Sequence, residues 1–164
     1  MTLDEFERLV KRLATGPDPD KKVMGWPGSR SELESRVPAA ARVSLDLHEL
    51  AVPSDGEELP KGDQRVARYL IERIRRAAQV HKHKSVRGRV FIVTGLDLLV
   101  KYQTGLTVFY EEVNDDRTAC VLVVEPVKLD AHELKRRVPY IHCNPMAVWN
   151  EIVRLLDNDK IIRN

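Results

Sequence analysis

A glycine-rich segment near the N-terminus has the residue types of a phosphate-binding loop. It reads Gly25-Trp26-Pro27-Gly28-Ser29-Arg30-Ser31 and follows the short apolar pair Val23-Met24. Loops of the form Gly-x-x-x-x-Gly-Lys-[Ser/Thr] cradle phosphates with backbone amides, contact them with the lysine and hold Mg²⁺ with the hydroxyl group. Here the last glycine is missing and Arg30 replaces the lysine. The segment therefore predicts either a shortened phosphate-binding loop or an ordinary Pro/Gly turn.

A second feature is an apolar run that leads to an acidic residue. Val90-Phe-Ile-Val93 is followed by Thr94, Gly95, Leu96 and Asp97. A buried strand that ends in carboxylates supplies a Mg²⁺ ligand and orients water in ATPases. Thr94 stands where the first acid is usual, so Asp97 is either this ligand or the N-cap of the following helix. A later apolar run ends at Glu125-Pro126, where such folds place a polar sensor residue.

A basic tract separates these two features. Residues 61–89 contain ten Lys and Arg residues but only two acids. Such a tract predicts either contacts with nucleic-acid phosphates, whose strength falls with salt, or a solvated helix face. The candidate phosphate contacts are Arg65, Arg68, Arg75, Arg76, Lys82, Lys84 and Arg87.

The histidines and cysteines predict no metal site. His81, His83, His142 and Cys143 match no common zinc-ligand spacing, and the two histidines at 81 and 83 are read as part of a basic loop. Cys120 lies in an apolar run and is expected in the core. Cys143 has no evident base beside it, so a cysteine nucleophile is not predicted.

The elements that must position these residues follow from hydrophobic periodicity. Apolar or alternating runs predict strands at 42–47, 90–93 and 119–124, and helical spacing covers 3–13, 31–36, 63–80, 131–137 and 145–156. Thr2 or Asp4 is the expected cap of the first helix. Residues 51–62 form a polar loop, and 96–113 have helical spacing with a break at Gly105. Strands that alternate with helices predict a three-layer α/β domain with a mostly parallel sheet of four or five strands.

Length and composition exclude several classes of protein. The chain has 164 residues, of which 43% are hydrophobic and 32% charged, as in a single folded domain rather than a disordered tail. No apolar run approaches the roughly 20 residues of a membrane span. The acidic start is unlike a secretory signal, so the expected location is cytoplasmic. Within one domain, 1–15 is an N-terminal helix, 21–126 the core and 127–164 a helical extension.

Taken in order, these features resemble the small P-loop protein of the BREX phage-defence systems of prokaryotes. The resemblance covers roughly residues 21–126 and includes Val-Ser-Leu-Asp-Leu at 43–47. It implies a degenerate P-loop NTPase-like core, for which Mg-ATP is the candidate cofactor. The implied partners are the other subunits of a defence complex, and DNA through backbone contacts. It places Asp97 near the Walker B position, and five residues in the nucleotide-facing loop: Gly25, Gly28, Ser29, Arg30 and Ser31.

Because both nucleotide motifs are incomplete, the expected function is that of a non-catalytic or weakly nucleotide-binding accessory subunit. Two alternatives remain open. One is an active ATPase that uses Arg30 for phosphate contact and Asp97 or Glu125 for Mg²⁺ and water. The other is a sequence-nonspecific DNA-binding module.

Overall fold

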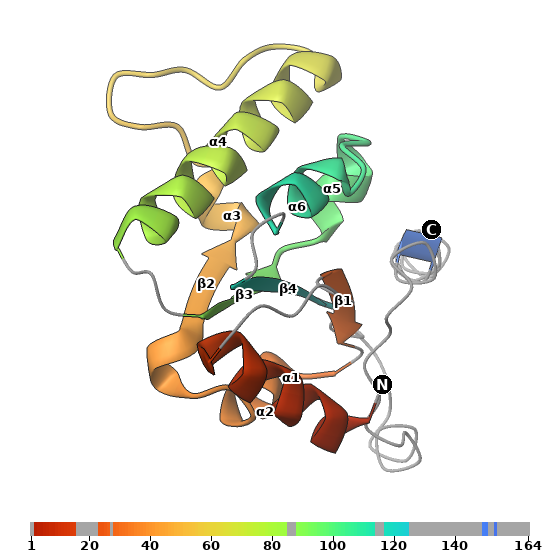
Figure 1. Cartoon of the computed structure of the whole chain (residues 1–164). Helices are drawn as coiled ribbons and strands as arrows, with labels where there is room; N and C mark the ends of the chain where they lie inside the picture. Colours follow the sequence, from red (N-terminus) through yellow and green to blue (C-terminus); the bar gives the residue numbers. More distant parts are fainter. Residues whose placement is uncertain are drawn as a thin grey trace.

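The computed structural model describes residues 2–15, 23–26, 28–84, 88–113, 117–124, 149–150 and 153. The predicted helix at 131–137 and most of the one at 145–156 lie outside these residues. Figure 1 shows the described elements in chain order: α1 (Leu3–Thr15), β1 (Val23–Trp26), α2 (Arg30–Ser35), a 3-10 turn (Ala39–Ala41), β2 (Arg42–Asp46), α3 (Leu47–Leu50), α4 (Asp63–Lys84), β3 (Arg89–Thr94), α5 (Asp97–Lys101), α6 (Thr107–Glu112) and β4 (Thr118–Val123).

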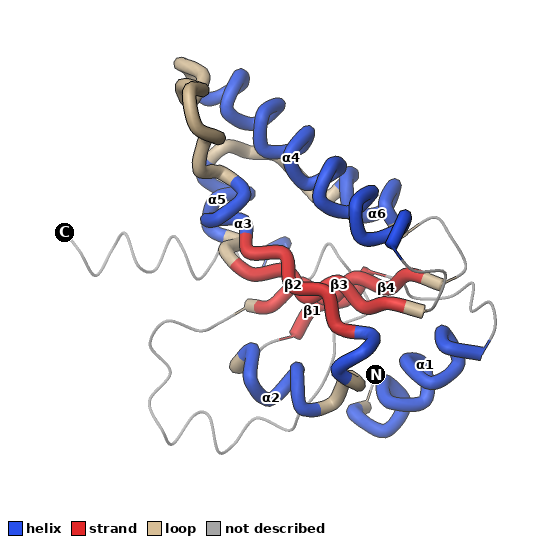
Figure 2. The backbone as a smooth tube through the Cα atoms, turned by 90° about the vertical axis from the view of Figure 1, so that its left-hand side faces the viewer, coloured by secondary structure: helices blue, strands red, loops and turns tan. Residues whose placement is uncertain are grey.

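The sheet has four described strands, all parallel, in the order β1-β4-β3-β2. The predicted α/β class and parallel sheet are confirmed. Helices cover both faces, with α1 and α2 on one side and α4, α5 and α6 on the other (Figure 2). The connection from β1 to β2 therefore crosses the whole sheet on the α1 face, whereas the later connections lie on the α4 face.

Alternating side chains of the strands build one core on each face, as the period of two in a strand requires. Phe91 and Val93 of β3 belong to the cluster under α4, while Val90 and Ile92 belong to the cluster over α1. Both sets are buried, which explains why the sequence of β3 is continuously apolar. Trp149 packs, partly buried, against the α4-side cluster.

Helix α1 begins with a capping box, one of the two caps expected. The backbone N–H of Glu5 donates to Thr2 Oγ1 over 3.3 Å, and the N–H of Thr2 donates to Glu5 Oε2 over 2.8 Å. These bonds lower the pKa of Glu5, chiefly through the backbone donor of Thr2.

Helix α4 is longer than predicted. Its apolar face carries Leu70, Ile74 and Ala78 onto the sheet, and the helix continues through Lys84. The prediction that His81 and His83 belong to a loop is therefore wrong. His81 contributes to packing instead, because its ring lies edge-on to Phe91 with centroids 6.5 Å apart.

The predicted break at Gly105 is confirmed, since this residue separates α5 from α6 with φ +69°. Cys120 is fully buried, as expected. No helix in the described ranges is both long enough and apolar enough to cross a membrane.

Candidate functional site

The carboxyl edge of the sheet is where a ligand site would form in this topology. After β1 the chain leaves toward the α1 face, and after β3 it leaves toward the α4 face. In parallel α/β sheets the crevice between connections that diverge in this way is the usual ligand position. Strand β4 separates β1 from β3, so the two strands that precede the predicted nucleotide motifs lie about 10 Å apart. Because the strands are parallel, both end at the same edge of the sheet.

The loop after β1 packs against the side chain of Trp26, the last residue of that strand. Trp26 is buried, and its Nε1 donates to the carbonyl oxygen of Ser29 over 2.8 Å. A Cβ atom on Gly28 would lie only 3.1 Å from the same Nε1. Glycine at 28 therefore lets the backbone lie against the indole ring.

The polar side chains of this loop are bonded within the chain. Ser29 is the N-cap of α2 and accepts at Oγ from the N–H of Glu32 over 3.3 Å. The hydroxyl groups of Ser29 and Ser31 lie 3.3 Å apart. Gly25 is not in the loop but inside β1, opposite Leu122.

Arg30, the residue in the lysine position, lies at the first position of α2. Its Nε is 2.7 Å from Glu34 Oε1, and its Nη2 donates to Ser44 Oγ on β2. Two partners thus hold the guanidinium, and a phosphate group would have to compete with both of them.

Asp97 is paired with a histidine that the sequence did not single out. Asp97 Oδ1 lies 2.8 Å from His48 Nε2, with side chains 47% and 55% exposed. The N-cap of α5 is Leu96, so the expected capping role of Asp97 is wrong. A carboxylate that orients an imidazole ring is an arrangement typical of general bases. The Oδ1 atom of Asp97 therefore already has a hydrogen-bond partner, His48.

Two neighbouring turns place His48 against Asp97. Asp46, at the end of β2, caps α3 by accepting from the N–H of His48 over 3.0 Å. Gly95, with φ +79°, lets the β3–α5 turn approach so closely that an added Cβ would be 2.8 Å from His48 Cδ2. In the sequence, His48 is recognisable only as a histidine that directly follows a predicted strand. Its pairing with Asp97 could be predicted only if β2 and β3 were known to be neighbours in the sheet.

Several predicted site residues lie outside the described part of the chain. These are Glu125, Arg87 and the side chain of Lys84. Across the described ranges, no group of three or more His, Cys, Asp or Glu side chains could hold a metal ion.

Several basic side chains of the predicted basic helix are paired with acidic side chains of the same chain. Arg75 Nη2 lies 2.8 Å from Glu111, and Arg76 Nε lies 3.4 Å from Glu72. Glu111 raises the pKa of Arg75 through this hydrogen bond. Lys82 Nζ lies 3.2 Å from Glu112 in a mostly buried pair.

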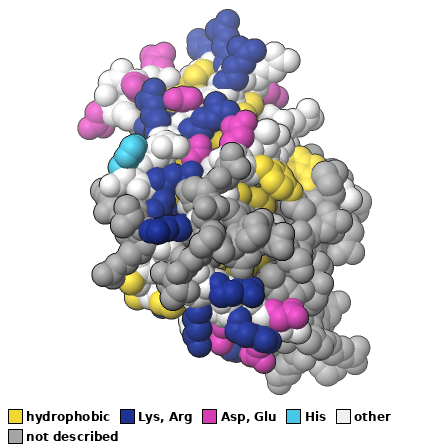
Figure 3. Space-filling model, viewed as in Figure 1, with side chains coloured by type: hydrophobic (Ala, Val, Ile, Leu, Met, Phe, Trp, Pro, Cys, Tyr) yellow, Lys and Arg dark blue, Asp and Glu magenta, His cyan; other side chains and the backbone are white. Residues whose placement is uncertain are grey.

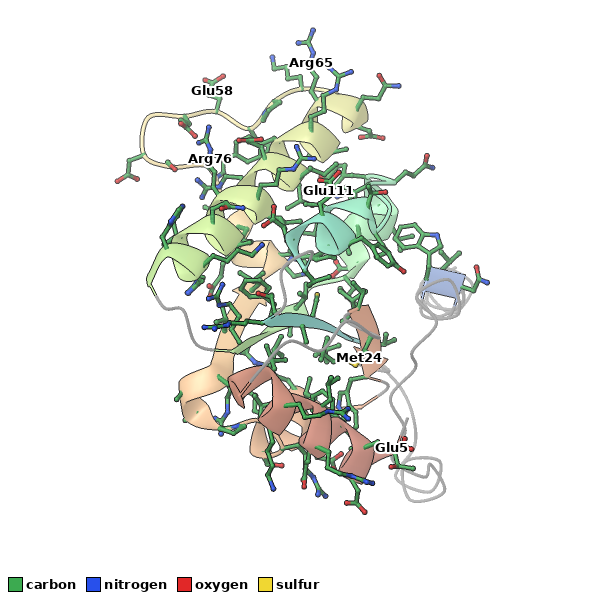
Figure 4. The ribbon with its side chains drawn as sticks, viewed as in Figure 1. Glu5, Met24, Glu58, Arg65, Arg76 and Glu111 are labelled. Carbon is green, nitrogen blue, oxygen red and sulfur yellow. The ribbon has the colours of Figure 1, made fainter. Side chains whose placement is uncertain are left out.

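Arg65 and Arg68 differ from these residues because both are exposed and neither has an ion-pair partner within the described ranges. Figure 4 shows Arg65 at the outer end of α4, pointing away from the rest of the domain. Lys and Arg side chains gather over this upper part of the molecule, with acidic side chains between them (Figure 3). Fewer basic side chains of α4 are therefore available to an external phosphate than the number of Lys and Arg residues in the sequence suggests.

Comparisons of the chain with protein-family models, with curated proteins and with solved structures find no match.

Proposed function

We propose that this protein is a non-catalytic or weakly nucleotide-binding accessory subunit of a prokaryotic anti-phage defence complex, with a core derived from a P-loop fold. The observation that carries the proposal is the state of the nucleotide-facing residues at the carboxyl edge. Arg30 is held by Glu34 and Ser44, while Asp97 is held by His48. A bound Mg-ATP would have to displace these internal partners before gaining its own.

The P-loop origin is supported by the arrangement of the motifs. The loop at 28–31 follows β1, Asp97 follows β3, and these two parallel strands end at the same edge of the sheet on either side of β4. The loss of catalysis is supported by the indole of Trp26, which is bonded to the loop carbonyl of Ser29. The accessory role within a defence complex comes from the resemblance alone.

Thermal unfolding with and without Mg-ATP tests the proposal. A ligand at 100 times its Kd stabilises a protein by about 2.7 kcal/mol, which is roughly 5–10 °C for a domain of this size. We expect a shift below about 2 °C at millimolar Mg-ATP, and no phosphate release. A larger shift that disappears in Arg30→Ala, together with hydrolysis abolished by Asp97→Asn, would establish the ATPase alternative instead.

A second function, contact with DNA backbone, is favoured by Arg65 and Arg68, which have no ion-pair partner among the described residues. If it operates, a duplex gel shift weakens steeply with salt and is lost in the Arg65→Glu/Arg68→Glu variant. Lys101→Glu is the matched control, because Lys101 is exposed on α5 and stacks on Tyr102. Binding that is equally weak in both variants, or insensitive to salt, removes this function.

A further inference from the structure

The sheet has an open edge at β2. Among the described strands, β2 pairs only with β3. Figure 2, which views the molecule from this side, shows α4 above β2 and both α1 and α2 below it. Within β2, Arg42 and Ser44 are exposed and Val43 is half-buried, whereas all four residues of β1 at the opposite edge are buried. The two edges of the sheet therefore differ, and β2 is the one that a further strand can reach.

Strand β2 has a regular backbone. Edge strands present unpaired N–H and C=O groups, and a proline, a bulge or a lysine commonly prevents two such edges from pairing. The sequence Arg42-Val-Ser-Leu-Asp46 contains no proline, glycine or lysine. All five of its residues pair in register with residues 90–94 of β3, without a bulge. The strand is therefore able to accept a second strand along its whole length.

The charges of this edge are complementary to those of a second copy of the same edge. Two copies related by a two-fold axis perpendicular to the sheet bring their β2 strands together antiparallel, with each face of the sheet continuing on its own side. When the axis passes through Ser44, Arg42 lies opposite the second copy's Asp46, and Val43 lies opposite its Leu45. A shift by two residues in either direction pairs only three residues and separates the opposite charges.

Both charged side chains have atoms available for such a pair. Arg42 donates from Nε to the carbonyl oxygen of Val37 over 2.7 Å, and its two Nη atoms have no partner in the described ranges. Asp46 accepts at Oδ1 from the N–H of His48 over 3.0 Å, and its Oδ2 has no partner among the same residues. Each group is therefore held at the edge by its own chain, with one side left for the second copy.

The centre of this pairing combines an apolar contact with balanced charge. On the α4 side, Leu45 belongs to the core and Val43 packs against it while still partly exposed. The second copy's Leu45 would cover Val43. On the other face, Ser44 accepts from Arg30 Nη2, and the same guanidinium is paired with Glu34. The two copies of Arg30 therefore approach the axis with their charges already compensated.

From these observations we infer that two copies of this chain associate edge to edge through β2, in an antiparallel register centred on Ser44. The two four-stranded sheets then form one continuous sheet, with an ion pair between Arg42 and Asp46 on each side of the axis. An edge of five residues is a small interface, so the dimer is reversible rather than permanent. The inference is independent of the proposed function and holds whether or not the carboxyl edge binds nucleotide.

A charge exchange in sedimentation velocity tests the association. We expect the parent chain to pass from monomer to dimer over about a hundredfold range of concentration. Arg42→Glu and Asp46→Lys each place like charges opposite each other on both sides of the axis, so each variant alone should raise Kd about tenfold or more. A mixture of the two variants restores opposite charges at both positions and should form dimers again. Lys101→Glu, an exposed change on α5, should leave Kd unchanged.

A disulfide tests the register. Directly opposite residues of an antiparallel pair have Cβ atoms about 4.5–5.5 Å apart, close to the separation that a disulfide spans. In a Cys143→Ser background, Ser44→Cys should therefore give a covalent dimer on mild oxidation. Arg42→Cys should give none, because position 42 lies roughly 14 Å from its own copy in this register. A disulfide in both variants, or in neither, contradicts the register.

A parent chain that stays monomeric at every concentration overturns the inference. So does a dimer that neither charge reversal weakens, or a mixture of the two folded variants that does not associate. Asp46→Lys also removes the cap of α3, so circular dichroism must first show that this variant is folded. Asp46→Asn covers the other case, because asparagine retains the cap and removes the charge. We expect it to raise Kd about threefold, and an unchanged Kd would equally refute the pairing.

Discussion

Replacement of Gly95 by alanine probes the turn that places Asp97 beside His48. An alanine there must adopt φ +79°, which costs about 1 kcal/mol for a residue with a Cβ atom. The same Cβ would lie 2.8 Å from His48 Cδ2 and 3.2 Å from the backbone nitrogen of His48, which Asp46 holds in place. Relieving this overlap costs about 1–2 kcal/mol more. We therefore expect a loss of about 2–3 kcal/mol in the free energy of unfolding.

Gly105→Ala is the control that separates the two contributions. Gly105 has φ +69°, but no atom of the described residues lies within 4 Å of the position where its Cβ would be. Urea denaturation should thus give a loss of about 1 kcal/mol for Gly105→Ala and a clearly larger one for Gly95→Ala. Equal losses would refute the close approach of the β3–α5 turn to α3.

A double-mutant cycle with His48→Ala tests the same contact from the other side. Removing the imidazole takes away the nearest atom but leaves the backbone contact and the positive φ. We expect Gly95→Ala to cost about 1 kcal/mol less in the His48→Ala background than in the parent. Strictly additive losses would show that the ring of His48 does not meet the turn.

Three further predictions concern other parts of the molecule. Glu112→Ala should lower the free energy of unfolding by about 2–3 kcal/mol, because it removes the mostly buried carboxylate that both Lys82 and Gln79 contact. Glu111→Ala removes one side of an exposed pair and should cost less than about 1 kcal/mol. Similar losses for the two variants in urea denaturation would contradict this difference. The pKa of Glu5 should lie below 4.5 in an NMR titration, because the backbone N–H of Thr2 donates to its carboxylate. The contribution of Glu5 to the stability of α1 is therefore present above pH 4.5 and is lost as the pH falls through the lowered pKa. A pKa at or above 4.5 would refute the capping bond. Burial raises the pKa of the Cys120 thiol. In a variant with the other cysteine replaced by serine, a thiol reagent should therefore react only when the chain unfolds. Rapid labelling of the folded chain would contradict the buried position of Cys120.

The elements that the sequence predicted well are those whose signal is local. The apolar runs of β3 and β4 give strands because both of their faces are buried, and the i, i+4 spacing of Leu70, Ile74 and Ala78 gives a helix that covers the sheet. The break at Gly105 follows from its positive φ, which favours glycine. Each of these features depends on residues only a few positions apart.

The misjudged elements depend on distant parts of the chain. The positive charge around His81 suggested a loop, but the imidazole packs edge-on against Phe91 of β3 and the helix continues through Lys84. Of the two roles predicted for Asp97, the helix cap was inferred from its immediate neighbours, yet its partner His48 follows a different strand. The order of strands in the sheet determines which strand ends lie side by side, and no local sequence pattern predicts that order.

The position of β1 has a consequence for how the chain reaches its native state. Val23 lies opposite Cys120, and the described contacts of β1 in the sheet are all with β4, so this pairing closes a loop of about 100 residues. Strands β2, β3 and β4 are joined through successive neighbours and can assemble as each emerges from the ribosome. Strand β1 precedes the others in the chain but pairs with β4, so the α1-side core cannot close until β4 has been synthesised. Folding should therefore be limited by docking of the N-terminal segment, because this pairing joins residues that lie far apart in the sequence.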